Sequence, residues 1–245
     1  MIDGLSVLAL VTARGGSAGL PRKNLRTVGG RSLVARAVQA GQRAETVDRV
    51  VLSSDDPEII QAALLAGCDV PFVRPAALAG DEARSIDVVR HALQALPERY
   101  DLLVLLQPTS PLRAPEDVDG AVELCVRREA PACVSVCAAD KPPFWIHGLD
   151  ERLRLQPILP EYRQASRRQD LPQAYAVNGA VYVARADWIM VLDSFIGPDT
   201  LGYVMPRERS IDIDDALDLA IAEMLDARLE GEGDVTQPAE IARKA

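Results

Sequence analysis

The sequence predicts an α/β fold in which a doubly wound, mainly parallel sheet carries helices on both faces. Short apolar runs alternate with stretches of helical periodicity through the first 137 of the 245 residues, and this alternation is typical of successive strand–helix units. The apolar runs are continuous rather than interrupted by polar residues, as expected for strands that are covered on both faces. Because 48% of the residues are hydrophobic, the chain can bury a sizeable core.

The expected strands are apolar runs that end at Gly, Pro or charged residues. They lie at residues 5–13, 49–53, 70–73, 101–107, 132–137, 177–184 and 201–205. The helices follow from apolar spacing and start signals. Ser32 is a candidate cap for the first helix, and Asp56 followed by Pro57 marks the start of the second, which Gly67 ends. Helices are expected at residues 33–43, 57–66, 85–96, 115–128 and 214–228.

The pattern loosens after Cys137. Residues 138–175 contain three breaks with proline and a charged stretch, so this segment is interpreted as an excursion from the sheet. The end of the chain is rich in Gly and charge, which favours a frayed tail. We therefore expect residues 1–230 to form a single domain that includes the excursion, and residues 231–245 to form a C-terminal tail.

Composition restricts the class of protein. No apolar run approaches the roughly 18 residues that a membrane-spanning helix needs, and the N-terminus lacks the basic start of a signal peptide. The net charge of −9 argues against general nucleic-acid binding. The four cysteines show no paired Cys-x-x-Cys spacing for zinc. We expect a cytoplasmic protein with neither a nucleic-acid partner nor a membrane anchor.

The charge is unevenly distributed along the chain. Residues 4–44 contain seven basic residues and no acidic one, so their net charge is +7, whereas the rest of the chain carries −16. A local positive zone on an acidic protein indicates a small anionic ligand held at one place. The alternative is a set of arginine-rich helix faces, which accounts for Arg36 and Arg43.

A glycine-rich loop, ARGGSAGLPRKN, follows the first expected strand at residues 13–24. Its three glycines let backbone N–H groups turn toward a ligand, and Arg14, Arg22 and Lys23 can neutralise a triphosphate. Ligands of open α/β sheets bind at the carboxyl ends of the strands, where this loop lies. The loop has neither the Walker A spacing nor the GxGxxG dinucleotide fingerprint. It therefore predicts phosphate binding of another kind.

Two carboxylates near the end of the chain have the spacing of a metal site. Asp212 and Asp214 are two residues apart in an expected extended segment, which places both on one face, while Ile211 and Ile213 point toward the core. Mg²⁺ typically binds one or two carboxylates together with substrate phosphates. The alternative is that the two aspartates serve only to cap the next helix.

Together these blocks resemble the acylneuraminate cytidylyltransferase family, also called CMP-sialic acid synthetases. The matching blocks are the loop at 13–24, Arg74-Pro75, QPTSPLR at 107–113, residues 168–173, NGAVY at 178–182 and SIDID at 210–214. They occur in the family's order and cover about residues 5–225. The stretch PPFW at 142–145 is more similar to the branch that activates legionaminic-type acids. The resemblance implies the fold of nucleotide-sugar enzymes and a homodimer in which the excursion takes part.

The resemblance also implies CTP and a sugar acid as substrates, Mg²⁺ as cofactor, and a role for particular residues. The expected nucleotide-binding residues are Ala13, Arg14, Gly15, Gly16, Ser17, Arg22, Lys23, Asn24, Arg74, Ser85 and Gln107. The expected sugar-binding residues are Gln107, Arg168, Gln173, Asn178 and Tyr182. The expected metal ligands are Asp212 and Asp214, and the expected catalytic residues are these two together with Arg14 and Lys23.

The residues themselves leave some of these roles open. Gln107 offers both a donor and an acceptor to a base or sugar, but the prolines around it also fit a rigid turn. Ser85 also fits a helix cap, and Tyr182 also fits the core. Arg168 has the guanidinium that binds a carboxylate through two hydrogen bonds, and a sialic-acid-like substrate carries such a carboxylate.

The expected reaction is nucleotidyl transfer, in which the anomeric hydroxyl of the sugar acid attacks the α-phosphorus of CTP and pyrophosphate leaves. This chemistry asks mainly for positioning and charge neutralisation. Two positions depart from the family pattern: Ala18 stands where many members have Lys, and Ala176-Val177 precede the Asn-Gly block where many have Arg. The alternatives are a Kdo-like sugar acid or GTP as substrate on the same fold, or a nucleotide-binding protein without catalytic activity.

Overall fold

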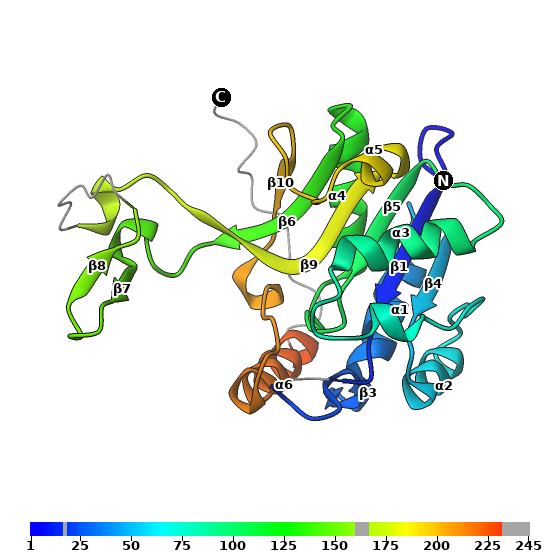
Figure 1. The fold of residues 1–245 in the computed structure, drawn as a ribbon, viewed down its shortest axis with the longest axis horizontal. Helices are drawn as coiled ribbons and strands as arrows, with labels where there is room; N and C mark the ends of the chain where they lie inside the picture. The colour runs from blue at the N-terminus through cyan, green and yellow to red at the C-terminus, as the bar shows by residue number, and fades with distance from the viewer. Residues whose placement is uncertain (17–18, 160–166, 232–245) are drawn as a thin grey trace.

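A computed structural model of the chain describes residues 1–16, 19–159 and 167–231. Its centre is a six-stranded sheet with the strand order β10-β6-β9-β5-β1-β4 (Figure 1). Strand β1 pairs in parallel with β4 and β5, and β10 pairs in parallel with β6. Strand β9 alone among these six runs antiparallel to its neighbours, β5 and β6. The prediction of a mainly parallel α/β sheet is confirmed.

The expected elements are present with small shifts in their bounds, except at residues 70–73. The strands of the sheet are β1 (Val7–Thr12), β4 (Arg49–Ser53), β5 (Leu102–Leu106), β6 (Ala132–Ala138), β9 (Tyr175–Arg185) and β10 (Leu201–Val204). The expected helices are α1 (Leu33–Arg43), α2 (Pro57–Leu65), α3 (Ser85–Ala95), α4 (Pro115–Arg127) and α6 (Ala216–Gly231); the short helix α5 (Ala186–Val191) was not expected. Two start signals are confirmed, because the Ser32 hydroxyl accepts a hydrogen bond from the N–H of Ala35 and the Asp56 carboxylate accepts one from that of Ile59.

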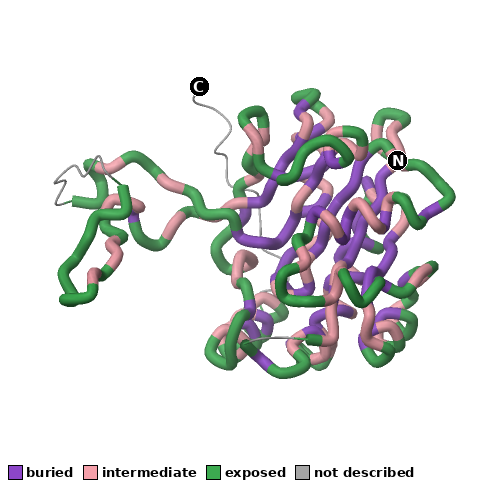
Figure 2. The backbone as a smooth tube through the Cα atoms, viewed as in Figure 1, coloured by how far each residue is buried: buried purple, intermediate pink, exposed green. Residues whose placement is uncertain are grey.

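The sheet is covered on both faces, as a doubly wound fold requires. Side chains of β1 alternate between the two sides. Val7, Ala9 and Val11 belong to a buried cluster that includes residues of α1, α2 and α4. Leu8 and Leu10 belong to a second cluster that includes residues of α3 and α5. Figure 2 shows the buried part of the chain concentrated in this sheet and the helix faces against it.

The strand expected at residues 70–73 is absent. The chain makes only an isolated parallel bridge there, between Val51 and Asp69. It then turns away from the sheet edge, and the N–H of Arg74 donates to the carbonyl of Ser54 over 2.8 Å. Strand β4 is the edge of the sheet. After the bridge, the chain crosses the carboxyl end of β4 instead of pairing along it.

Two short hairpins were not expected from the sequence. Strands β2 (Thr27–Val28) and β3 (Arg31–Ser32) pair next to α1. Strands β7 (His147–Leu149) and β8 (Leu155–Pro157) pair within the excursion. Figure 1 shows this excursion as an arm that projects from the sheet and is connected to it by the ends of β6 and β9.

No disulfide links the cysteines, all four of which are free. Burial raises the pKa of the Cys68 and Cys133 thiols to about 12 and that of Cys125 to about 11. Thiols with such pKa values are poor nucleophiles at neutral pH, so these side chains serve packing. Within the ranges described above, no helix is long and apolar enough to cross a bilayer.

The start of α4 is fixed by a buried carboxylate. Asp117 is fully buried, and it accepts a hydrogen bond of 2.9 Å from the N–H of Ala114, at the N-cap position. The same carboxylate forms a two-pronged ion pair with Arg209, at 2.8 Å for both nitrogens. Asp117 therefore connects α4 to the segment that leads from β10 toward Asp212.

Replacing Asp117 with Asn is expected to lower the free energy of unfolding by about 3 kcal/mol, because the guanidinium of Arg209 loses its buried partner. Urea denaturation of both proteins measures the difference. The neighbouring Glu116→Gln, at an exposed position, should change stability by less than about 0.5 kcal/mol. Equal effects of the two substitutions would show that the buried ion pair has no special importance.

Candidate active site

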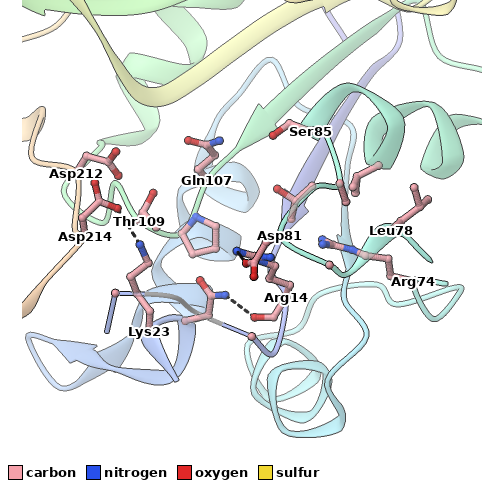
Figure 3. Close-up of a pocket in the computed structure, with 18 residues that line it drawn as sticks. Arg14, Lys23, Arg74, Leu78, Asp81, Ser85, Gln107, Thr109, Asp212 and Asp214 are labelled. Carbon is pink, nitrogen blue, oxygen red and sulfur yellow. Dashed lines mark hydrogen bonds and ion pairs between the residues drawn. The ribbon is translucent and has the colours of Figure 1, made fainter. Parts of the chain in front are cut away.

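A cavity of about 620 Å³ opens at the carboxyl ends of β1 and β5. Its lining residues come from the glycine-rich loop, the segment between β4 and α3, the turn after β5, and the 212–214 segment (Figure 3). The lining consists of Thr12, Arg14, Gly16, Gly19, Lys23, Asn24, Arg74, Leu78, Gly80, Asp81, Ala83, Ser85, Val88, Gln107, Pro108, Thr109, Asp212 and Asp214. This is the edge of the sheet at which the sequence placed a ligand.

The glycine-rich loop is held by hydrogen bonds to its neighbours. The N–H of Ala13 donates to the Ser53 carbonyl, and the N–H of Gly15 donates to Asp55, both over 3.1 Å. The side-chain amide of Asn24 donates to the Arg14 carbonyl over 2.9 Å. Ala13 and Gly15 therefore support the loop from outside the lining, whereas Gly16 and Asn24 border the cavity. Ser17, the remaining predicted contact of this loop, and Ala18 lie outside the described residues.

Gly19 explains how the loop comes close to the metal-site candidates. A Cβ atom at this position would collide with the main-chain carbonyl oxygen of Asp214. Only glycine permits this approach. The loop and the 212–214 segment, almost 200 residues apart in sequence, are thereby brought to one wall of the cavity.

The two cations of the lining that follow β1 each have an acidic partner. Arg14 is 2.6 Å from Asp81, and Lys23 is 3.0 Å from Asp214 (Figure 3). Both acids are well exposed, with 79% and 80% of their side-chain surface accessible, whereas Lys23 retains only 15%. Exposed ion pairs contribute little free energy, so a polyphosphate can replace these carboxylates at modest cost.

Arg22, a third predicted phosphate contact, lies outside the cavity lining. It adopts a left-handed backbone conformation with φ of 56°, and its guanidinium pairs with Glu58 at 2.8 Å. Glu58 belongs to the first turn of α2. The charge of Arg22 is thus directed to a neighbouring helix; a phosphate contact of this residue remains a prediction.

Arg74 and Ser85 line the end of the cavity away from the aspartates (Figure 3). The Arg74 guanidinium is buried and donates to the hydroxyl and carbonyl oxygens of Ser53. Burial lowers the pKa of Arg74 to about 10, which leaves it positively charged at neutral pH. Ser85 is the first residue of α3, with Arg84 at the cap position, so its hydroxyl is not the helix cap that its sequence position also allowed.

Gln107 follows β5 and borders both the main cavity and a smaller one of about 240 Å³. Gly179 packs against it with φ of 75°, and a Cβ there would lie 3.1 Å from the Gln107 side-chain oxygen. Glycine therefore satisfies both the backbone conformation and the space at this point. Tyr182 and Ser85 also border the smaller cavity, next to the buried ring of Phe195.

Asp212 and Asp214 flank the fully buried Ile213, as the alternation of the sequence predicted. The N–H of Ile213 donates to the Thr109 carbonyl over 2.8 Å, which fixes the segment to the turn after β5. Desolvation at the cavity wall raises the pKa of Asp212, although the residue is still exposed; the Thr109 side chain opposes this shift, and the charge of Asp214 adds to it. The site thus has a surplus of negative charge on one face.

These two carboxylates fit a divalent cation that also contacts phosphate. No group of three or more His, Cys, Asp or Glu side chains is arranged to hold a metal within the described part of the chain. Mg²⁺ does not need such a group, because it commonly uses one or two carboxylates, substrate oxygens and water. A cation held by Asp212 and Asp214 would also neutralise the charge of Asp214, which adds to the effect of desolvation on the pKa of Asp212.

The other predicted sugar contacts are spread over two regions. Asn178 is buried, and its amide accepts from Ser135 over 2.6 Å and donates to Ser210 over 2.9 Å. It therefore positions the segment before Asp212 from outside the cavity lining. Arg168 and Gln173 belong to the arm and do not line either cavity described above. Contact of these three residues with a sugar remains a prediction.

Sequence reasoning missed three lining residues that matter for the geometry. Asp81 lies in an irregular loop where no periodicity distinguishes one acid from another. Thr109 was part of a recognised block, but its main-chain hydrogen bond with Ile213 depends on a segment about 100 residues away. Phe195 follows a short helix that was not predicted. No local signal identifies these positions.

Comparisons with known proteins agree with this geometry. The profile of a family described as cytidylyltransferase matches residues 8–139. The chain is 33% identical over 217 residues to an N-acylneuraminate cytidylyltransferase of Escherichia coli, with 88% of the chain and 51% of that protein covered, so it spans about half of this relative's length. It is 32% identical to a CMP-N,N'-diacetyllegionaminic acid synthase of Legionella pneumophila, with 90% of the chain and 96% of that protein covered.

Further relatives support the same family. A pseudaminic acid cytidylyltransferase of Campylobacter jejuni is 33% identical, with 89% of the chain and 95% of that protein covered. Among solved structures, a CMP:2-keto-3-deoxy-manno-octonic acid synthetase complexed with CTP has a TM-score of 0.67 and 18% identity, covering 91% of the chain and 99% of that chain. A 4-diphosphocytidyl-2C-methyl-D-erythritol synthase from Anaerococcus prevotii has a TM-score of 0.61 and 15% identity, covering 93% and 100%. These two structures show the shared fold.

The raised pKa of Asp212 predicts how stability depends on pH. Because its pKa is higher in the folded than in the unfolded protein, its contribution to stability is present below the unfolded pKa of about 3.9 and is lost as the pH rises through the folded pKa. Asp212→Asn should therefore be more stable than the wild type at pH 7, with a difference that shrinks toward pH 4. Urea unfolding in EDTA measures this difference, with Asp199→Asn as the exposed control; a loss of stability at pH 7 would contradict the prediction.

Proposed function

The chain belongs to the cytidylyltransferase family, and on this premise we propose that it transfers CMP from CTP to the anomeric hydroxyl of a sialic-acid-like nonulosonic acid and releases pyrophosphate. One observation carries the proposal. Arg14, Lys23, Asp212 and Asp214 come from opposite ends of the chain and line a single cavity at the carboxyl edge of the sheet. Cations and paired carboxylates around one cavity are what a metal–nucleotide substrate requires.

We propose one orientation for the nucleotide in the main cavity. The triphosphate would lie between the glycine-rich loop and the aspartates, where Arg14 and Lys23 can exchange their carboxylate partners for phosphate oxygens. The base would lie toward Arg74 and Ser85, at the far end of the cavity in Figure 3. The cavity volume of about 620 Å³ is within the range of roughly 300–1,000 Å³ for small-molecule sites.

The sugar acid would lie at the smaller cavity of about 240 Å³, which shares Ser85 and Gln107 with the main one and is open to it there. This placement brings the acceptor beside the nucleotide at Gln107. Tyr182 and Phe195 supply an apolar wall to the cavity, and Arg84 and Asp193 supply polar groups. An acylated sugar acid has both kinds of surface.

The reaction needs one bond to form and one to break at the α-phosphorus. The anomeric oxygen bonds to phosphorus and gives up its proton to water, as the bond to the bridging oxygen of pyrophosphate breaks on the opposite side. Arg14 and Lys23 neutralise the charge that grows on the leaving pyrophosphate. Gln107 orients the acceptor, since it borders both cavities. Mg²⁺ held by Asp212 and Asp214 would neutralise phosphate charge and polarise the attacking hydroxyl.

The relatives guide the choice of acceptor. Several relatives with matching lengths are named for legionaminic or pseudaminic acid, so we propose a nonulosonic acid of this kind. An acid of the 3-deoxy-octonic type is the second candidate, because a synthetase for that acid shares the fold over 91% of the chain. The free cysteines favour a reducing compartment, and we propose that the reaction takes place in the cytoplasm.

With CTP and Mg²⁺, the protein should release pyrophosphate when given one of N-acetylneuraminic, legionaminic, pseudaminic or Kdo acids, and EDTA should stop the reaction. A coupled pyrophosphate assay, repeated with GTP, identifies both substrates. Asp212→Asn should reduce turnover at least 100-fold, because a ligand for the cation is lost, while the control Asp199→Asn stays near wild type. CTP binding without pyrophosphate release for any acceptor would instead support a catalytically silent nucleotide-binding protein.

We also propose a homodimer formed through the arm. The tip of the arm exposes a group of aliphatic side chains, with 63% of Leu149, 77% of Leu153, 66% of Leu155 and 60% of Ile158 accessible. Apolar side chains clustered on a projecting element are typical of an interaction surface. Because the arm extends away from the sheet of its own chain (Figure 1), we propose that its Arg168 and Gln173 reach a cavity of the second subunit.

Light scattering on a sizing column should give a mass about twice the 26.5 kDa of one chain. The double substitution Leu153→Glu and Leu155→Glu should yield a monomer, because it places charges in the proposed interface. Leu65→Glu on α2 is the matched control, since Leu65 is 80% exposed and lies away from the arm. A wild-type monomer, or a dimer that survives the double substitution, would rule out this interface.

A further inference from the structure

A small cavity of about 120 Å³ lies behind the turn that carries Gln107, between α1 and the chain that leads into α4. Among the described residues, its lining contains four arginines and no acidic side chain. The lining consists of Arg31, Arg36, Gln39, Ala40, Arg43, Pro111, Arg113 and Pro115. Neither cavity of the proposed active site shares a lining residue with it.

Helix α1 supplies one wall of this cavity. Arg36, Gln39, Ala40 and Arg43 are spaced three and four residues apart, so they lie on one face of the helix. Arg36 is neutralised by an ion pair with Asp226. Arg43 is exposed and has no hydrogen bond or ion pair with any described residue.

Arg31 completes the exposed side of the cavity. It forms an ion pair of 3.3 Å with Glu230 and retains 39% of its side-chain surface. Such an exposed pair is weak, so its guanidinium is available to a second anion. Arg31 and Arg43 therefore offer donors at the mouth of the cavity.

Arg113 forms the inner wall and is only 5% exposed. Its two terminal nitrogens donate to the carbonyls of Gln107 and Ala180, but its Nε is buried and has no hydrogen-bond partner among the described residues. The carboxylates that act on it electrostatically are Asp117, already paired with Arg209, and Asp212. A buried guanidinium without its own counter-ion is costly, and an anion in the cavity would reduce that cost.

We propose that this cavity is a binding site for a phosphate-type oxyanion, either orthophosphate or pyrophosphate. The volume equals that of about four water molecules, which admits a phosphate group and excludes a nucleoside. Guanidinium groups match phosphate oxygens with paired hydrogen bonds. Bound there, the anion fixes Arg113, and through the main-chain carbonyl of Gln107 it holds the turn that separates the two active-site cavities.

The test measures phosphate binding directly and requires no turnover, so it is independent of the proposed reaction. Sodium phosphate is titrated by calorimetry into the Lys23→Ala variant at constant ionic strength and in EDTA. The substitution removes a cation from the main cavity and EDTA removes divalent metal, so phosphate binding in the main cavity is weakened. One site is expected. Adding Arg43→Gln should weaken the affinity at least about tenfold, because a charge-assisted contact is lost, and Arg31→Gln should act in the same direction.

The matched control is Arg127→Gln on α4, whose side chain is 67% exposed and outside the cavity; it should leave the affinity unchanged. A parallel titration with pyrophosphate distinguishes the sources, since tighter binding of pyrophosphate identifies the reaction product as the ligand and weaker binding identifies free phosphate. The proposal is overturned if Lys23→Ala protein binds neither anion, or if Arg43→Gln and Arg127→Gln weaken binding equally.

Discussion

The candidate active site depends on a buried arginine. Arg113 joins the carbonyl of Gln107, at the end of β5, to the carbonyl of Ala180, within β9. Hydrogen bonds from Ser110 to Asn178 and from Ile213 to Thr109 extend the same connection to the segment that carries Asp212. Three blocks that lie between residues 107 and 214 are thereby locked together by main-chain acceptors. Because the acceptors are main-chain carbonyl groups, these hydrogen bonds constrain the backbone. The side chains that line the cavity remain free to bind ligands.

Much of the fold follows from local sequence signals. Continuous apolar runs gave the strands of the sheet, and the caps at Ser32 and Asp56 gave helix starts that the structure contains. The direction of β9 did not follow, because pairing with β5 and β6 is decided by contacts far apart in sequence. The prediction of a strand at 70–73 was wrong for the same reason, because pairing is not decided locally. The apolar residues of this segment resemble a strand, but the chain makes only one bridge at the sheet edge.

The site was predictable to the extent that its residues lie in blocks with a chemical pattern. Arg14, Lys23, Asp212 and Asp214 were selected for charge and spacing, and they line one cavity. The sequence does not show which residue forms an ion pair with each of these charged side chains. It does not indicate that Arg14 meets Asp81 or that Arg22 turns to Glu58, because the packing of the sheet and helices decides which segments approach the glycine-rich loop.

The place of β9 in the sheet has a consequence for biosynthesis. Strands β4, β1 and β5 can pair as soon as residue 106 has left the ribosome, and they already present the glycine-rich loop. Strand β6 is made next but has no neighbour to join, because β9 separates it from β5. Until residue 185 emerges, the nascent chain therefore carries an open edge on β5, and such edges promote aggregation. The arm lies between β6 and β9 in sequence, so its length sets how long that vulnerable interval lasts.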